Sequence, residues 1–272
     1  MRRKRIESCR VSAERIVAFR GGGYAPRRIA WASAATLIGL LAVWQSLASL
    51  GWVSTAFASS PAAIGRALWQ LGVSGELWGH VSASLRRLAI GWLVGTVAGL
   101  IVGVLLGLFT LARSPGMAVV SALFPIPKIA LVPLFIIWFG IGEGSKIVTL
   151  AFGVFFPTVI NTMAGVDSVP RGLIRMAQSF NLRPWSILTK IVLPGAMPAV
   201  LSGFRITTST AIILLVAAEM IGADRGIGAF VLQAGNLYDT DNLLAGIVVL
   251  SGIGLCVSWV LGCLERVWLR WR

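Results

Sequence analysis

Apolar residues are gathered into long blocks along this chain, separated by shorter segments that hold most of its charged side chains. A helix of about 20 residues crosses the roughly 30 Å hydrocarbon core of a bilayer, so each block is long enough for one span. The pattern predicts an all-α membrane protein with six transmembrane helices. The predicted spans are Ile29–Leu50, Leu88–Leu108, Met117–Phe139, Ile147–Gly165, Ala199–Ile221 and Leu243–Leu264.

A shorter amphipathic segment lies between the first two blocks. Two serines followed by Pro61 form a helix-start signal, because serine caps a helix and proline fits its first turn. Apolar residues then recur on one face of Pro61–Leu71, which predicts a short helix on the outer membrane surface. At the start of the second span, we expect Arg86 and Arg87 to extend outward to the same surface.

Composition supports the membrane class. Only 12% of the 272 residues are charged and 57% are hydrophobic, with a mean hydropathy of +0.85. Soluble domains carry about a quarter charged residues. The net charge of +14 does not indicate nucleic-acid binding, because nine of the 24 Lys and Arg residues lie in the first 28 positions. We expect a basic tail at 1–28, a single transmembrane domain at 29–272 and no nucleic-acid partner.

The placement of positive charge also predicts orientation. With a cytoplasmic N-terminus, eighteen Lys and Arg residues lie on the cytoplasmic side and five lie outside, while Lys128 falls within a span. Cytoplasmic segments are enriched in these residues. We therefore expect a multi-pass protein of the bacterial inner membrane with both termini in the cytoplasm.

Glycine recurs every four residues in the second span. Residues at this spacing follow a slowly winding stripe on a helix, where small side chains let another backbone approach closely. The stripe predicts a tight helix contact within one subunit rather than a ligand site. Its members are Gly91, Gly95, Gly99, Gly103 and Gly107.

Prolines interrupt the third span, at Pro125, Pro127 and Pro133. Broken backbone at membrane depth is tolerated only where protein or a water-filled cavity satisfies its polar groups. Lys128 lies beside these prolines, and a charge within a span marks a candidate functional site. We expect Pro127, Lys128 and Pro133 to line a translocation pathway. The alternative is that Lys128 lies near the cytoplasmic interface and extends to it.

The loop between the fourth and fifth spans carries a recognisable motif over about 171–194. It resembles the cytoplasmic EAA loop of ABC importer permeases, whose pattern is E-A-A, three residues, G, nine residues, then I-x-L-P. The spacing fits, and the identical positions are Ala177, Ile191, Leu193 and Pro194. Three positions depart from the pattern: Arg175 stands where the family has Glu, Met176 replaces Ala, and Asn181 replaces Gly.

The residues themselves suggest what this loop does. Two short helices, at about Leu173–Phe180 and Pro184–Ile191, are expected to meet at a turn, and Asn tolerates the left-handed conformation that such a turn requires. An apolar face at helical spacing could dock into a groove of a partner protein. We expect that face to comprise Leu173, Met176, Ala177 and Phe180, and Pro194 to end the second helix.

The resemblance extends over about residues 30–265, including the Pro127–Lys146 stretch, the Leu193–Pro198 stretch and Ala218–Ala223. Together these are similar to the ABC permease subfamily that serves nitrate, sulfonate, taurine and related solutes. The resemblance implies the type I importer permease fold and a homodimer in the membrane. It also implies two cytoplasmic ATP-binding subunits and a periplasmic or lipid-anchored substrate-binding protein.

Motifs for chemistry are absent from the sequence, which has no phosphate-binding P-loop, nucleophile elbow or metal-ligand cluster. We therefore expect a non-catalytic subunit without a cofactor, whose partner subunits bind ATP and Mg²⁺. The alternative function is a secondary transporter driven by an ion gradient, which would need inverted repeats and coupled carboxylates within the membrane. We find no such repeat, and Glu219 is the one acidic candidate within a span.

Glu219 has two interpretations. Near the outer end of the fifth span, it could form part of an outer gate where a binding protein delivers the solute. It could equally cap a helix or pair with Arg225, and an anionic solute would be repelled by its charge. We favour the structural interpretation.

Overall fold

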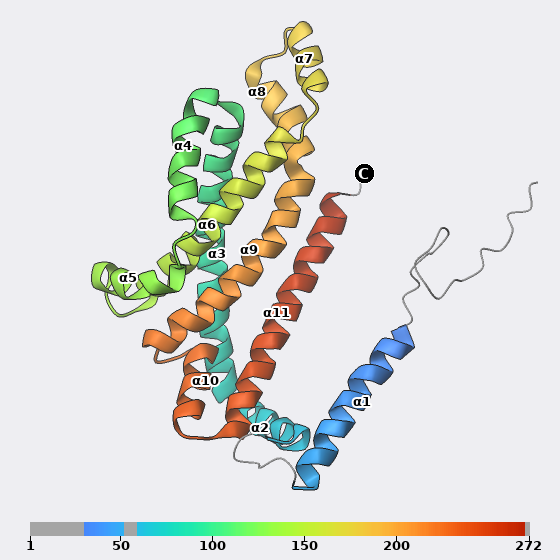
Figure 1. Cartoon of the computed structure of the whole chain (residues 1–272), viewed down its shortest axis with the longest axis vertical. Helices are drawn as coiled ribbons and strands as arrows, with labels where there is room; N and C mark the ends of the chain where they lie inside the picture. The colour runs from blue at the N-terminus through green and yellow to red at the C-terminus, as the bar shows by residue number, and fades with distance from the viewer. Residues whose placement is uncertain (1–29, 52–58, 270–272) are drawn as a thin grey trace, which may run out of the picture.

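The computed structural model describes residues 30–51 and 59–269, so the predicted basic tail at 1–28 lies outside the described residues (Figure 1). The described residues form helices and contain no strand, which confirms the all-α class. The helices are α1 (Ala30–Ser49), α2 (Pro61–Ser74), α3 (Glu76–Leu108), α4 (Thr110–Leu123), η1 (Lys128–Leu131), α5 (Val132–Phe139), α6 (Glu143–Asp167), α7 (Arg171–Ser179), α8 (Pro184–Ile187), η2 (Leu188–Val192), α9 (Leu193–Gly222), α10 (Ile227–Asn236) and α11 (Thr240–Trp268).

Four helical segments of the described chain are long and apolar enough to cross a membrane: α3, α6, the continuous run from α8 through α9, and α11. A fifth crossing is possible if α4 and the η1–α5 segment form one span. The first predicted span, Ile29–Leu50, corresponds to α1, whose apolar part Ala34–Ser49 is shorter than the other four helical segments.

The third span is not the single helix expected at Met117–Phe139. Helix α4 begins earlier, at Thr110, and the chain bends by 86° between α4 and the η1–α5 segment. Pro125 and Pro127 lie in the break, where their missing N–H groups prevent continuous helical hydrogen bonding. The α5 segment consequently projects sideways from the bundle (Figure 1).

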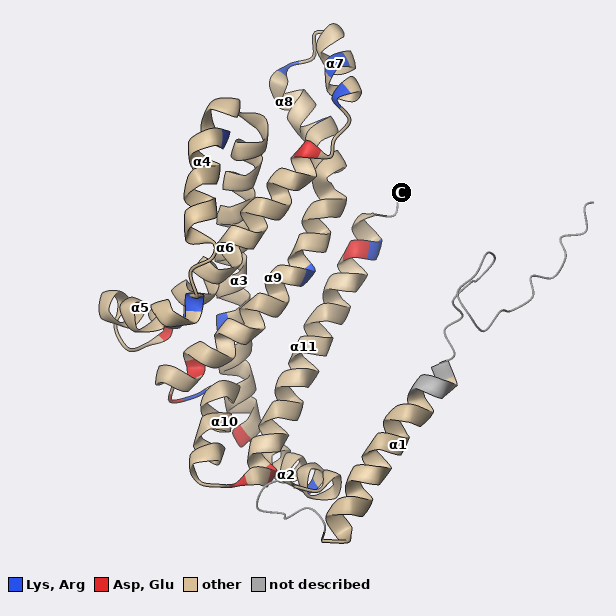
Figure 2. Cartoon of the chain, in the orientation of Figure 1, with Lys and Arg blue, Asp and Glu red and all other residues tan. Residues whose placement is uncertain are grey.

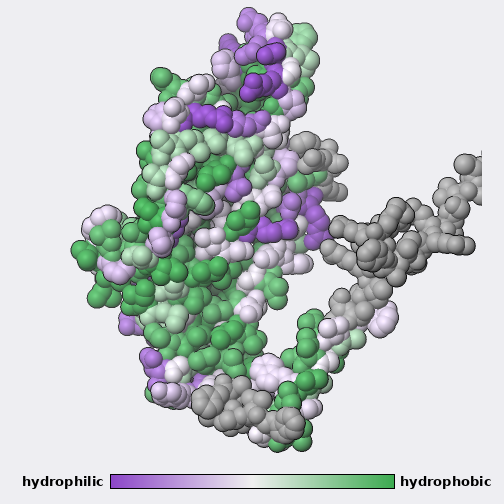
Figure 3. All heavy atoms as spheres, in the orientation of Figure 1, coloured by the Kyte–Doolittle hydropathy of each residue, from purple (hydrophilic) through white to green (hydrophobic). Residues whose placement is uncertain are grey.

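The two ends of the bundle differ in character. Helices α7 and α8 form one end, called here the loop end, and α2 and α10 lie at the opposite, far end (Figure 1). Basic residues are prominent on α7 and on the turn that precedes α8 (Figure 2). Hydrophilic surface gathers at the loop end, whereas hydrophobic surface covers α5 and much of the flank (Figure 3).

Helix α2 begins where the sequence predicted. The Ser60 hydroxyl accepts a hydrogen bond from the Ala63 N–H (3.2 Å), and Pro61 occupies the first turn. The apolar face of α2 is buried against Phe230 of α10 and Ala245 of α11. An amphipathic helix thus closes the far end of the bundle.

The glycine stripe of α3 lies against α6. A Cβ placed at Gly99 would lie 2.7 Å from the Thr158 Cβ, and one at Gly103 would lie 2.6 Å from the Thr162 Cβ. A Cβ placed at Gly95 would lie 2.9 Å from the Ala151 Cα, so Gly95 faces the backbone of Ala151. The stripe therefore brings two helices of one chain to within direct backbone contact.

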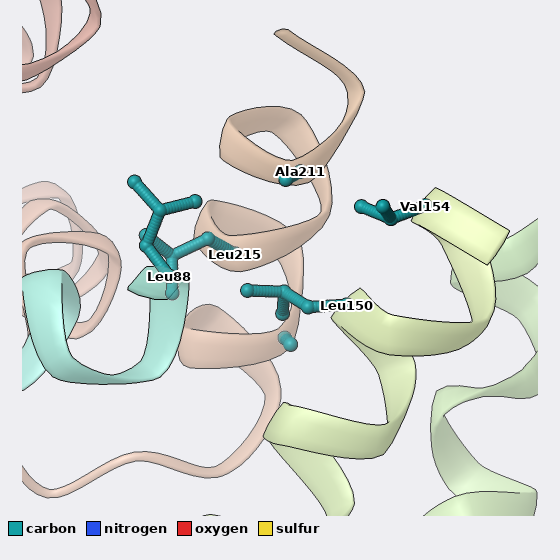
Figure 4. Packing of buried hydrophobic residues seen from close by; sticks show 6 residues of the cluster. Leu88, Leu150, Val154, Ala211 and Leu215 are labelled. Atoms are coloured by element: carbon teal, nitrogen blue, oxygen red, sulfur yellow. The ribbon is translucent and has the colours of Figure 1, made fainter. Parts of the chain in front are cut away.

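Helix α9 completes the central core on the other side of α6. Leu88 of α3, Leu150 and Val154 of α6, and Ala211 and Leu215 of α9 form one buried cluster (Figure 4). By contrast, the most apolar stretch of α11 has none of its residues buried within the described chain. Helices α3, α6 and α9 thus form the packed centre.

We predict that Gly95→Ala destabilises the protein, because the new methyl group meets backbone atoms of Ala151 that no side-chain rotation can move. Overpacking of this kind costs about 1–3 kcal/mol. The control is Gly79→Ala on the same helix, where nothing lies within 4 Å of the added Cβ. Thermal unfolding in detergent should show a lower midpoint for Gly95→Ala alone. Equal midpoints for the two variants would contradict close packing at the stripe.

Candidate functional site: the α7–α8 loop, the broken span and the far-end ion pairs

The turn after α7 is a Schellman motif built on Asn181. This residue has φ +53°, the left-handed conformation expected of the residue at the glycine position. The Leu182 N–H donates to the Ala177 carbonyl (3.2 Å), and the Asn181 N–H donates to the Gln178 carbonyl (2.9 Å). These two bonds satisfy carbonyls that the end of a helix leaves free. Asn181 thereby sets the angle between α7 and α8.

The exposed face of α7 is narrower than the sequence predicted. Phe180 is 73% exposed, and Leu173 and Met176 are about half exposed. Ala177, however, is only 2% exposed and faces its own chain, so its expected place on the docking face is wrong. This side of α7 therefore rests on the bundle.

Sequence reasoning missed the residue that shares this inner face. Ile174 packs against a cluster that joins the end of α6 to η2 and α9 and includes Val166, Val192 and Ala196. Ile174 lies three positions before Ala177, a spacing that puts both residues on one helix face, and this was the available sequence signal. Together Ile174 and Ala177 seat α7 on the bundle and leave the Leu173, Met176 and Phe180 face outward.

The second short helix does not end at Pro194. Helix α8 continues through the π-helical turn η2 into α9, so that 184–222 is one helical run. Pro194 lies in the first turn of α9, directly after η2. A π turn shifts the hydrogen-bond register, which lets the chain stay helical beside a residue that lacks an N–H. Ile191 lies within η2, and the side chain of Leu193 is exposed.

Charged residues surround the base of the loop. Arg113 of α4 forms a bidentate ion pair with Asp167 at the end of α6, with N–O distances of 2.8 and 2.5 Å. Arg175, which stands at the family's Glu position, is exposed and forms no ion pair within the described chain. The loop end is thus tied to α4 through Asp167.

In the broken span, Lys128 takes over a backbone role. Its Nζ donates to the Phe124 carbonyl, the group that the Lys128 N–H would serve in an unbroken α-helix. The same Nζ lies 4.7 Å from the centre of the Phe124 ring and 5.8 Å from that of Phe156. Pro127 directly precedes η1, and Pro133 lies in the first turn of α5.

At the far end, Arg87 is buried in an ion-pair network, and the expectation that it extends outward is wrong. It is only 3% exposed. Its Nη1 donates to Glu219 Oε1 (2.7 Å), while its Nε donates to Glu143 Oε2 (2.9 Å). These carboxylates belong to α6 and α9, so the guanidinium on α3 is paired with two anions inside the bundle. A lipid-facing position would offer it no anion. Arg86 does remain at the surface, 3.2 Å from Glu143.

Glu219 has every part of its carboxylate engaged. It is 1% exposed and accepts from Ser84 Oγ (2.8 Å) and from the Gly228 N–H (2.9 Å) as well as from Arg87. Its ion-pair partner is therefore Arg87 and not Arg225, whose main-chain carbonyl accepts from Arg87 Nη1 (2.6 Å). The network joins α3, α6, α9 and the start of α10.

Gly226 lets this network close. Its φ is +143°, and a Cβ at this position would overlap the Glu219 carboxylate. The Gly226 N–H also donates to His80 Nδ1 (3.1 Å). Ser84, Arg87 and Glu143 were missed as members of this cluster, although a charged pair at the start of an apolar span was a signal of buried partners.

Comparison with known proteins places these features in a family. Residues 95–269 match the family model described as the binding-protein-dependent transport system inner membrane component. The chain is 38% identical over 235 residues to the putative aliphatic sulfonates transport permease protein SsuC of Escherichia coli (strain K12), covering 86% of this chain and 89% of that protein. It is 36% identical over 245 residues to the taurine transport system permease protein TauC of the same organism, covering 88% and 89%.

A solved structure shares the fold. A chain of the MetNI methionine ABC transporter in an inward-facing conformation superposes with a TM-score of 0.61 and 25% sequence identity, covering 71% of this chain and 95% of that one. The family match spans more than half of the sequence and includes the α7–α8 loop. The chain therefore belongs to the family of binding-protein-dependent transport system inner membrane components, as a membrane-spanning permease subunit of an ATP-driven importer.

Proposed function

We propose that this permease imports a small anionic solute, with taurine and aliphatic sulfonates the best candidates and nitrate a further one. The proposal rests on the names of the similar permeases SsuC and TauC. Two copies of the chain form the pathway, two cytoplasmic subunits bind ATP and Mg²⁺, and an external binding protein delivers the solute at the far end. The loop end and both termini face the cytoplasm, in agreement with the distribution of Lys and Arg.

The observation that carries the mechanism is the exposed apolar face of Leu173, Met176 and Phe180. An amphipathic helix that presents such a face can lie in a groove of a partner. The helical run 184–222 then connects the loop directly to the far end, so a displacement of α7 is passed along α9. We propose that the ATP-binding subunit holds this face and moves α9.

At the far end, the network around Arg87 holds α3, α6 and α9 together. We propose that this end acts as a fixed point while the loop end moves. Glu219 then serves the outer gate only by positioning helix ends, because Arg87, Ser84 and Gly228 already occupy its carboxylate. The broken span with Lys128 lines the pathway between the two ends.

We predict that Phe180→Asp prevents the ATP-binding subunit from copurifying and abolishes uptake. An unpaired charge buried in an interface costs several kcal/mol, and each 1.4 kcal/mol lowers affinity about tenfold, so association should fall by about a hundredfold or more. The control is Gln178→Asp, which adds the same charge to an exposed position on another side of α7. Ala177→Asp is unsuitable because Ala177 is buried in its own chain.

The measurement is the ratio of ATP-binding subunit to permease after affinity purification, together with uptake in cells. Because such a subunit reaches the permease only from the cytoplasm, the same experiment tests the orientation of the loop end. Full copurification and uptake with Phe180→Asp would refute the docking role of this face.

For Lys128, we predict that removal of the charge and removal of the hydrogen bond have separable effects. Lys128→Met leaves the Phe124 carbonyl unpaired, which costs about 1–3 kcal/mol, and should lower both the unfolding midpoint and uptake. Lys128→Gln keeps a donor but no charge, so we expect near-normal stability with reduced uptake of an anion. Normal uptake by Lys128→Gln at matched expression would exclude Lys128 from the pathway.

We predict that Arg87→Met destabilises the permease by about 3–5 kcal/mol, because it leaves buried Glu219 without its counter-charge. The double variant Arg87→Met/Glu219→Met should recover much of that loss, since a buried ion pair replaced as a unit is often neutral. Arg86→Met removes an exposed pair and should cost less than about 1 kcal/mol. Thermal unfolding of the three purified variants checks this order, and equal loss for Arg86 and Arg87 would contradict it.

A further inference from the structure

Helix α11 stands partly away from the packed centre. The residues of its most apolar stretch are not buried within the described chain, although Ile253 and Val257 touch the central cluster. Near its C-terminal end, α11 is joined to α9 by the Arg205–Glu265 ion pair, with Nη2 and Oε2 3.0 Å apart. Space is therefore left between α11 and its neighbours on the flank of the bundle.

Part of that space is an apolar crevice of about 170 Å³ between α3, α9 and α11. Trp92, Thr208 and Val257 contribute to its walls, and the exposed side chain of Ala89 lies at its edge. The crevice is formed by three spans, so the molecules available to fill it are those of the membrane. Its chemistry suits a hydrocarbon chain.

A second hollow, of about 550 Å³, lies between α9 and the C-terminal end of α11. It adjoins the crevice along the helices, because Arg205 lies one turn from Thr208 and Gly262 directly follows Leu261. Arg205, Glu265 and Arg266 supply its charged groups. Figure 2 shows charge gathered where α9 faces this end of α11.

The charges of this hollow favour an anion. Two guanidinium groups face it against a single carboxylate, and Arg266 has no carboxylate partner within the described chain. Arg266 instead folds back, donating through Nε to the Gly262 carbonyl (3.1 Å). Arginine binds phosphate oxygens well because its planar donors match their geometry. Basic hollows between spans on the cytoplasmic side are typical headgroup sites.

We propose that the crevice and the hollow together form a binding site for one anionic phospholipid. Its phosphate lies between Arg205 and Arg266, beside the ion pair to Glu265, and one acyl chain follows the crevice past Trp92 and Val257. The bound lipid fills the space between α9 and α11 and secures α11 against the centre. The site rests on the proposed orientation, with the loop end in the cytoplasm, but it does not depend on the proposed solute or ATPase contact.

Native mass spectrometry tests this site. The full-length chain, purified in detergent with the subunits that it retains, is titrated with phosphatidylglycerol and with phosphatidylcholine of the same acyl chains. A basic residue near the headgroup contributes about fivefold in affinity. We therefore expect tighter binding of phosphatidylglycerol and a loss of about fivefold in Arg266→Gln. The loss for phosphatidylcholine should be smaller, because its choline cation offsets the charge of its phosphate.

Matched controls separate this site from general electrostatics. Arg183→Gln removes the same charge from the exposed α7–α8 turn, and Arg66→Gln removes it from exposed α2 at the far end. Both variants should bind phosphatidylglycerol as the unchanged protein does. Ala89→Trp fills the crevice without altering charge and should weaken binding of both lipids.

Four outcomes would overturn the proposal. The first is equal affinity for the two lipids, and the second is an equal effect of Arg266→Gln and Arg183→Gln. The third is that a cysteine placed at Ala89 crosslinks two copies of the chain, which would mean that a helix of the second copy occupies the crevice. The fourth is that the hollow binds millimolar inorganic phosphate through Arg266 but shows no saturable binding of phosphatidylglycerol, which would mean a site for free phosphate.

Discussion

Helix α3 approaches α6 so closely that a methyl group on any of five glycines would overlap the facing helix, and the other helices are arranged around this contact. Within hydrocarbon, apolar side chains gain little by leaving lipid, so close packing supplies much of the attraction between spans. Helix α9 uses the same device on α6, where Leu214 covers Gly153 and Asn161 covers Gly203. The three helices therefore form a dense centre, while α1 and α11 keep large surfaces available to lipid or to a second subunit.

This centre is constrained differently at its two ends. At the far end, Arg87 joins two carboxylates from other helices and leaves little freedom of movement. At the loop end, α7 rests on the bundle through Ile174 and Ala177, and the Asn181 turn directs its apolar face outward. A continuous helix connects the two ends, and its π turn lies beside the loop. A loop end that can move and a far end that is held by ion pairs suit the division of roles proposed above.

The broken span shows how the membrane constrains the backbone. A backbone carbonyl in hydrocarbon requires a donor, and the prolines before η1 remove donors from this segment. Lys128 supplies one from its side chain, so a single residue both satisfies the bend and places a positive charge within it. A bend of this kind is stable only inside protein or beside water, which supports the proposal that this span lines the solute pathway.

The amino-acid sequence by itself determined the features that depend on neighbouring residues along the chain. Hydrophobic block length predicted the four helical segments that are long enough to cross a membrane. The serine–proline start predicted α2, four-residue glycine spacing predicted a helix contact, and the Asn181 position predicted a left-handed turn. Only the tertiary structure decided the burial of Arg87, whose partners Glu143 and Glu219 lie 56 and 132 positions away. It also decided that Ala177 faces inward and that the helix passes through Pro194. The local sequence pattern shows that a side chain needs an ion-pair partner or a packing site. The free energy of burying that side chain depends on groups that only folding brings close to it.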